Sequence, residues 1–355
     1  TDYGLAAIIV THDLAVARLL SGQILNDLVV ERQRNPGLDP LKYVRERLAN
    51  DPTPQQNLAA QRNAEALRRM PPQVNTRDGL NAVQAQEIEA RLYSNAPIDY
   101  NFLAAGFTQV TTSKFQMNTE LLAYNRTFDF FGQSGKVNLI LPYAQLHGKT
   151  TVGNQVITGS SAGLTDPIIR LAANLYGAPA MSVEEFKHYQ QDLIIGANLS
   201  AVLPWGEYNS NQLFNVGANR SFIQPGLGVS QAKGPWRFEL SGDVTFFSDN
   251  KNFYGNNVLS QSPIYSGTGH VIYYFPSTAW LSTDVTYYSG GQSFVNGAQI
   301  NNTQENWLFG ATLSMPVNTH NAVKFHVAEG SFFSQGQYYT MYGVVWQYRW
   351  ADGGK

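Results

Sequence analysis

The amino-acid sequence predicts an all-β protein, an antiparallel transmembrane β-barrel of about twelve strands preceded by a short α-helical N-terminal region. Polar and apolar residues alternate with a period of two from residue 100 onward. Many alternating segments run for about 11–16 residues, longer than the usual strands of soluble sheets. Tryptophans stand near the segment ends. A soluble β-sandwich or a β-helix remains the alternative, because either also buries one face of each strand.

The composition changes abruptly near residue 93. Residues 1–94 hold 22 of the 50 charged side chains but only 3 of the 44 aromatic ones, whereas the following 261 residues hold 27 of the 31 glycines. Such a shift marks a boundary between unlike structures. We therefore expect a polar helical region over 1–92 and a barrel over 93–355.

Four stretches of the first 92 residues place apolar side chains at helical spacing. They begin at Gln23, Leu41, Leu58 and Leu80, and prolines separate the first three. Because these stretches hold few apolar residues, we expect a loosely packed region, such as a fusion or a fragment.

The start of the chain holds a Thr-His-Asp motif. Residues 3–21 resemble the switch-histidine segment of ABC-transporter ATPases, in which the histidine, here His12, contacts the γ-phosphate. A phosphate-binding loop needs a glycine five residues before Gly148 of "HGKTT", and Tyr143 stands there. That sequence and the signature-like "SGGQ" at 289–292 also follow His12 instead of preceding it. We therefore expect no ATPase activity.

Twelve alternating segments follow in the second part of the chain. In the segment 235–248, Trp236, Phe238 and Leu240 share one face, and Arg237 and Glu239 share the other. The predicted segments are 100–112, 117–131, 136–150, 164–176, 191–204, 217–231, 235–248, 261–275, 278–291, 299–316, 321–333 and 338–350.

Aromatic residues near the strand ends predict girdles at the two water–lipid interfaces. The opposite faces are small and polar, as a wet lumen requires. The candidates for the girdles are Trp205, Trp236, Trp280, Trp307, Trp346 and Trp350.

Several blocks of the second part resemble one known family. They are "YSNAPIDYNFLAAGF" (93–107), "RTFDFFGQSGKVNLILPYA" (126–144), 163–189, 203–230, 246–255, 261–275 and "VVWQYRW" (344–350). In this order they resemble the family described as the MetA-pathway of phenol degradation, also labelled transporter. The resemblance implies a Gram-negative outer-membrane barrel that passes small, aromatic or hydrophobic compounds.

Two features depart from the family pattern. Members begin just before the first of these blocks with an export signal, which we do not recognise here. They also end near the last aromatic residue, whereas five residues follow Trp350.

Charged and amide side chains within strands should face the lumen, because a charge on the lipid face costs free energy. They are candidates for a constriction that sets selectivity, or for an interior network of salt bridges. Their mixed signs argue against a strongly ion-selective pore. The candidates are Glu120, Arg126, Arg170, Asn174, Asn198, Arg220, Arg237, Glu239, Asp243, Asp284, Lys324, His326, Gln347 and Arg349.

The expected function is that of an outer-membrane channel or transporter, and not of an enzyme. The expected partners are outer-membrane lipid, a small-molecule solute and the barrel-assembly machinery. The net charge of −2 argues against nucleic acid, and the six scattered histidines show no metal-ligand spacing, so we expect neither metal nor cofactor. A structural or adhesive barrel is the alternative; a barrel hydrolase built around His270, His326, Ser241 and Asp243 is the less favoured one.

Overall fold

The computed structural model describes residues 90–113, 115–152, 155–212, 214–299, 303–332 and 337–352. The predicted helices before residue 90 and the segment around His12 lie outside these residues. The boundary between the two predicted regions therefore stays a prediction.

Twelve antiparallel strands form a closed barrel, as expected, because β2 pairs with both β1 and β3 and thereby joins the two ends of the sheet. Strand order around the barrel follows chain order, and the last strand, β17, pairs with the first. The strands are β1 (Tyr100–Thr112), β2 (Phe115–Phe130), β3 (Gln133–Val152), β5 (Ile168–Tyr176), β6 (Leu193–Val202), β7 (Phe222–Lys233), β8 (Trp236–Phe247), β11 (Ile264–Tyr274), β12 (Trp280–Gly290), β15 (Gln304–Pro316), β16 (Asn321–Phe332) and β17 (Gln337–Ala351).

Among the described residues, five further strands lie outside this ring. Within the described residues, the strand β4 (Gln155–Leu164) pairs only with the C-terminal half of β3, residues 143–152. A separate four-stranded sheet joins β9 (Asn250–Phe253), β10 (Asn257–Gln261), β13 (Ser293–Val295) and β14 (Ala298–Gln299).

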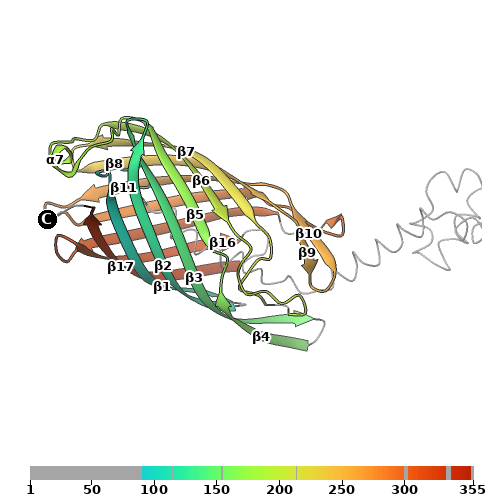
Figure 1. Ribbon diagram of the computed structural model, residues 1–355. Helices are drawn as coiled ribbons and strands as arrows, with labels where there is room; N and C mark the ends of the chain where they lie inside the picture. The colour runs from blue at the N-terminus through green and yellow to red at the C-terminus, as the bar shows by residue number, and fades with distance from the viewer. Residues whose placement is uncertain are drawn as a thin grey trace, which may run out of the picture. The chain divides into compact units, whose positions relative to one another are not determined.

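The two ends of the barrel differ, as Figure 1 shows. At one end, which we call the turn end, lie the start of β1, the end of β17 and the short connections 131–132, 234–235, 275–279 and 317–320. The helix α7 (Val183–Phe186) lies there too, in the longer connection 177–192; its N-cap is Ser182, whose hydroxyl accepts from the Glu185 amide. At the opposite, loop end lie the long connections 203–221, 248–263 and 291–303.

Alternation along each strand separates two faces of the wall. The outer face carries exposed apolar side chains such as Leu139, Leu227 and Phe309. The inner face of the same strands carries Asn138, Gly226 and Gly310. Of the described helices, none has the length and apolar character needed to cross a membrane.

Candidate functional site

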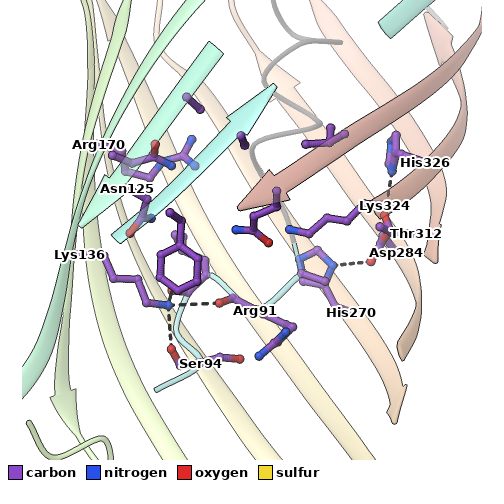
Figure 2. A pocket seen from close by; sticks show the side chains of 18 of the residues that line it. Arg91, Ser94, Asn125, Lys136, Arg170, His270, Asp284, Thr312, Lys324 and His326 are labelled. Atoms are coloured by element: carbon purple, nitrogen blue, oxygen red, sulfur yellow. Dashed lines mark hydrogen bonds and ion pairs between the residues drawn. The ribbon is translucent and has the colours of Figure 1, made fainter. Parts of the chain in front are cut away.

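A cavity of about 260 Å³ occupies the middle of the lumen (Figure 2). One wall comes from β1, β2, β3 and β5, and the other from β11, β12, β15, β16 and β17. Apolar side chains such as Phe102, Ile140 and Trp280 line it beside polar ones such as Asn138 and His270. The cavity therefore offers both apolar surface and hydrogen-bonding groups to a small solute.

Residues 90–97, which we call the lumen segment, border the cavity. The ammonium group of Lys136 on β3 donates to the carbonyl oxygens of Leu92 (2.8 Å) and Ser94 (2.7 Å). Figure 2 shows Lys136 reaching from the wall to this segment. A charged donor on two main-chain carbonyls fixes a stretch that has no strand partner of its own.

Further hydrogen bonds hold the lumen segment, among them those from Asn95 to the Pro179 carbonyl and from Thr127 to the Pro97 carbonyl. The Arg91 amide donates to Glu239 (2.7 Å), and Asn198 donates to the Tyr93 hydroxyl (2.8 Å). The Tyr93 ring lies against Gly196 and Gly228, where a Cβ atom would overlap it. These glycines therefore make room in the wall for the ring.

At the loop end, the connection 203–221 folds toward the lumen. Its Phe214 and Val216 are buried in an apolar cluster with Leu146, Leu308 and Met341, which come from opposite walls. The Phe214 ring lies over Gly148 of β3, where a Cβ atom would collide with it. The lumen is thus filled by apolar side chains beyond the cavity.

Asp166 anchors this connection. Its side chain is fully buried, and its two oxygens accept from the amides of Gly206 (2.8 Å) and Ala218 (2.7 Å). Near its end, Arg220 donates to Gln261 (2.7 Å), which itself donates to the Gly291 carbonyl. Burial lowers the pKa of Arg220 to about 10, which leaves it charged at neutral pH. The three loop-end connections are therefore tied together.

Nine of the predicted lumen residues lie on the inner face of the strands. Glu239 accepts from Ser230 (2.9 Å), Asp243 accepts from Asn198 (3.2 Å), and Asp284 contacts His270 at 2.6 Å. These three carboxylates thus contact Ser230, Asn198 and His270. The role of these residues in selectivity stays a prediction. The nine are Arg170, Asn174, Asn198, Glu239, Asp243, Asp284, Lys324, His326 and Gln347.

Three other candidates lie at the barrel ends. Arg220 precedes β7 and belongs to the loop-end connection, although the predicted strand began at residue 217. Arg237 donates to the carbonyl oxygens of Gly234 and Trp236, and Arg349 donates to that of Thr319, all at the turn end. Arg237 and Arg349 thus stabilise turns at the barrel rim, outside the central cavity.

The prediction that Glu120 and Arg126 face the lumen is wrong. Leu121, Ala123 and Asn125 of β2 line the cavity, so the even-numbered residues point outward. Arg126 lies near the turn end, where it pairs with Asp352 (2.6 Å) and Asp99 (3.2 Å).

Glu120 is exposed on the outer wall, opposite Phe107 and Tyr143 of the neighbouring strands. The rule that charges point inward therefore gave the wrong face on this strand.

Trp280 is not part of an outer girdle, because it faces the lumen. It is 3% exposed, and the charged groups of Arg91 and Lys324 lie 5.6 and 5.9 Å from its ring centre. Trp205 lies in the exposed loop-end connection, outside any strand. The other four, Trp236, Trp307, Trp346 and Trp350, lie on the outer face, and their place at lipid interfaces stays a prediction.

Replacing Glu120 with leucine is expected to stabilise the barrel in lipid by about 1 kcal/mol, because a carboxylate leaves a lipid-facing wall. Urea titration of the barrel folded into lipid vesicles measures the change. Glu239→Leu is the control, and we expect a loss of about 2 kcal/mol, since the Arg91 amide and Ser230 lose their acceptor. A loss of stability in both variants would contradict the outward placement of Glu120.

Sequence reasoning missed the cavity residues Lys136, Asn125 and Asn138, and also Phe214 of the loop-end cluster. Lys136, Asn138 and Ile140 alternate with Val137, Leu139 and Leu141, so the period of two could have placed the first set inward. No local pattern points to Phe214, whose position depends on the fold of a whole loop.

A closed antiparallel barrel with an apolar outer face and a polar, partly filled lumen defines the class of transmembrane β-barrels. The chain belongs to the family described as Putative MetA-pathway of phenol degradation, whose model matches residues 101–347. No curated protein sequence matches the chain. The fold-family resemblance predicted from the sequence is thus confirmed for the barrel.

The barrel is similar to the crystal structure of the COG4313 outer membrane channel from Pseudomonas putida F1. The TM-score is 0.64 at 16% identity, over 74% of this chain and 100% of that chain. The KdgM porin (TM-score 0.39, 11% identity, 69% and 98% covered) and the CymD monoaromatic hydrocarbon channel (0.38, 7%, 72% and 89%) are more distant. At such low identity the first likeness supports the fold, and the other two are too remote to carry an argument.

Proposed function

We propose that this protein is an outer-membrane channel that passes small aromatic or hydrophobic compounds through its lumen. The observation that carries the proposal is the central cavity, which lies between the lumen segment and the apolar loop-end cluster. Phe102 and Trp280 supply aromatic surface in it, and Leu121, Ile140 and Leu308 supply aliphatic surface. The family description and the fold of the similar outer-membrane channel support the same class.

The unequal ends suggest an orientation. Outer-membrane barrels have short periplasmic turns and longer extracellular loops. The turn end would then face the periplasm and the loop end the exterior. The apolar outer face would contact outer-membrane lipid, and assembly would use the barrel-insertion machinery.

The contacts in the lumen do not favour a hydrolase. Ser282 donates to Asp284 (2.9 Å), and Asp284 also contacts His270, so the carboxylate lies between serine and histidine. A serine nucleophile needs a direct hydrogen bond to its base. Ser241 and Asp243 lie on β8. Within the described residues, neither of them makes a hydrogen bond to His270 or His326.

The purified full-length chain in planar lipid bilayers is expected to give discrete conductance steps. Small aromatic solutes in the bath should shorten or interrupt these steps, because they occupy the cavity through which ions pass. A denatured sample of the same preparation is the control. Folded protein that inserts into bilayers but gives neither conductance nor solute-dependent interruption would favour a structural barrel and contradict the proposal.

A further inference from the structure

Two asparagines stand side by side on the cavity wall. Asn125 of β2 and Asn138 of β3 are direct partners in the antiparallel register, and both line the cavity. Directly opposed residues on one face of a sheet have Cβ atoms about 5 Å apart. Figure 2 shows Asn125 on the wall that also carries Lys136 and Arg170. The two carboxamides therefore form one polar patch inside the lumen.

Neither carboxamide is satisfied by the protein. The Oδ1 atoms of Asn125 and Asn138 are buried without a hydrogen-bond partner. Within the described part of the chain, no hydrogen bond involves either amide group, so the result does not depend on which atom is nitrogen. By contrast, Asn174 donates to Ser134 and Asn198 donates to Tyr93, both at 2.8 Å. An unsatisfied buried polar group destabilises a protein, so two together need an explanation.

The neighbours of this pair include two cations and several apolar side chains. Arg170 lies opposite Asn138 in the register and donates to Ser200. Lys136 donates to the lumen segment, so both cations already have protein partners. Phe102 of β1 lies opposite Asn125 in the register and also lines the cavity. Ala123 and Ile140 follow the two asparagines along the inner faces of their strands. A carboxamide both donates and accepts, as a hydroxyl or an amide of a solute does. The patch thus matches an uncharged aromatic compound that carries one such group.

We propose that Asn125 and Asn138 determine specificity by binding the hydroxyl or amide group of an aromatic solute, while Phe102 contacts its ring. This inference rests on the proposed channel function and adds a preference within it. A hydrocarbon of the same shape leaves both amides unsatisfied and binds more weakly. One or two hydrogen bonds in a hydrated lumen correspond to a preference of about fivefold to tenfold.

Benzyl alcohol and ethylbenzene are matched probes, because a hydroxyl in one replaces a methyl in the other. Equilibrium dialysis of the folded full-length chain in detergent measures binding of each, corrected for uptake by empty micelles. The variants are Asn125→Leu, Asn138→Leu and the double variant. Asn118→Leu is the control, because Asn118 is on the same strand as Asn125 but lies on the outer face, like Glu120.

The native chain is expected to prefer benzyl alcohol by about fivefold to tenfold, and the double variant should lose that preference while it binds ethylbenzene at least as well. Its heat stability, followed by the gel mobility of the folded barrel, should be unchanged or higher, because two unsatisfied amides are removed. A preference that persists in the double variant overturns the inference, as does equal binding of both probes to the native chain. In the second case ethylbenzene binding leaves the channel proposal intact, whereas a chain that binds neither probe and gives no conductance contradicts both.

Discussion

Lys136→Met is expected to release the lumen segment and to raise channel conductance severalfold. The substitution keeps most of the length of the side chain but removes the ammonium group that holds the carbonyls of Leu92 and Ser94. Hydrogen bonds from a charged donor contribute about 1.5–3 kcal/mol, so the local opening equilibrium should shift by about ten- to a hundredfold. Hydrogen exchange of the amides of Arg91 and Ser94 measures that shift directly, and bilayer recordings measure its effect on conductance.

Lys233→Met is the matched control for this prediction. Lys233 is an exposed lysine at the turn end of β7, and its loss removes the same charge without touching the lumen segment. We expect native exchange and native conductance from it. If Lys136→Met leaves the exchange of Arg91 and Ser94 unchanged, the two carbonyl contacts do not hold the segment.

The period of two predicts the fold well, because one residue of shift exchanges the two faces of a strand. The inward or outward assignment was wrong where it followed the polarity of single residues instead of their alternation along the strand. Trp280 and Asp284 are four residues apart on β12, so they must share a face. An outward Trp280 and an inward Asp284 were therefore incompatible from the start. A strict count along the strand would have placed both in the lumen.

On β2 the count alone is ambiguous. Each face mixes polar and apolar residues, Glu120 with Leu122 on one and Leu121 with Asn125 on the other. The cost of a charge on the lipid face, a few kcal/mol at most, is smaller than the cost of breaking the register of a whole strand. Pairing with the neighbouring strands therefore determines which face of β2 points inward, and Glu120 lies on the outer face. Near the turn end, Arg126 is partnered by Asp352, which reduces its cost there.

The filling of the lumen could not be predicted from local patterns. The lumen segment is held by contacts to residues on β2, β3, β6 and β8, from 30 to 148 positions away. The loop 203–221 makes close backbone approaches at Gly206 and Gly217, where a side chain would collide with backbone. What places Phe214 in the lumen is the glycine pair on β3 and β4, a feature that only the paired strands bring together.

Phe214→Ala is expected to weaken the loop-end closure and to destabilise the barrel by about 3 kcal/mol, because a buried ring is lost from the apolar cluster. The Asp166 contacts remain in this variant and should keep the connection attached at its base. Conductance should rise moderately, since the lumen segment still narrows the other side of the cavity. Urea titration in vesicles and bilayer recordings measure the two effects.

The double variant Lys136→Met/Phe214→Ala separates this arrangement from a single constriction. The lumen segment and the loop-end cluster border the lumen at different heights, so their resistances add in series. Relieving one leaves the other limiting, and relieving both should raise conductance by more than the sum of the two single increases. Leu122→Ala, which trims an outer-face side chain of β2, is the control for stability loss alone and should leave conductance native. If the double variant conducts no better than the better single variant, only one of the two closures limits flow, and the cavity is open on its other side.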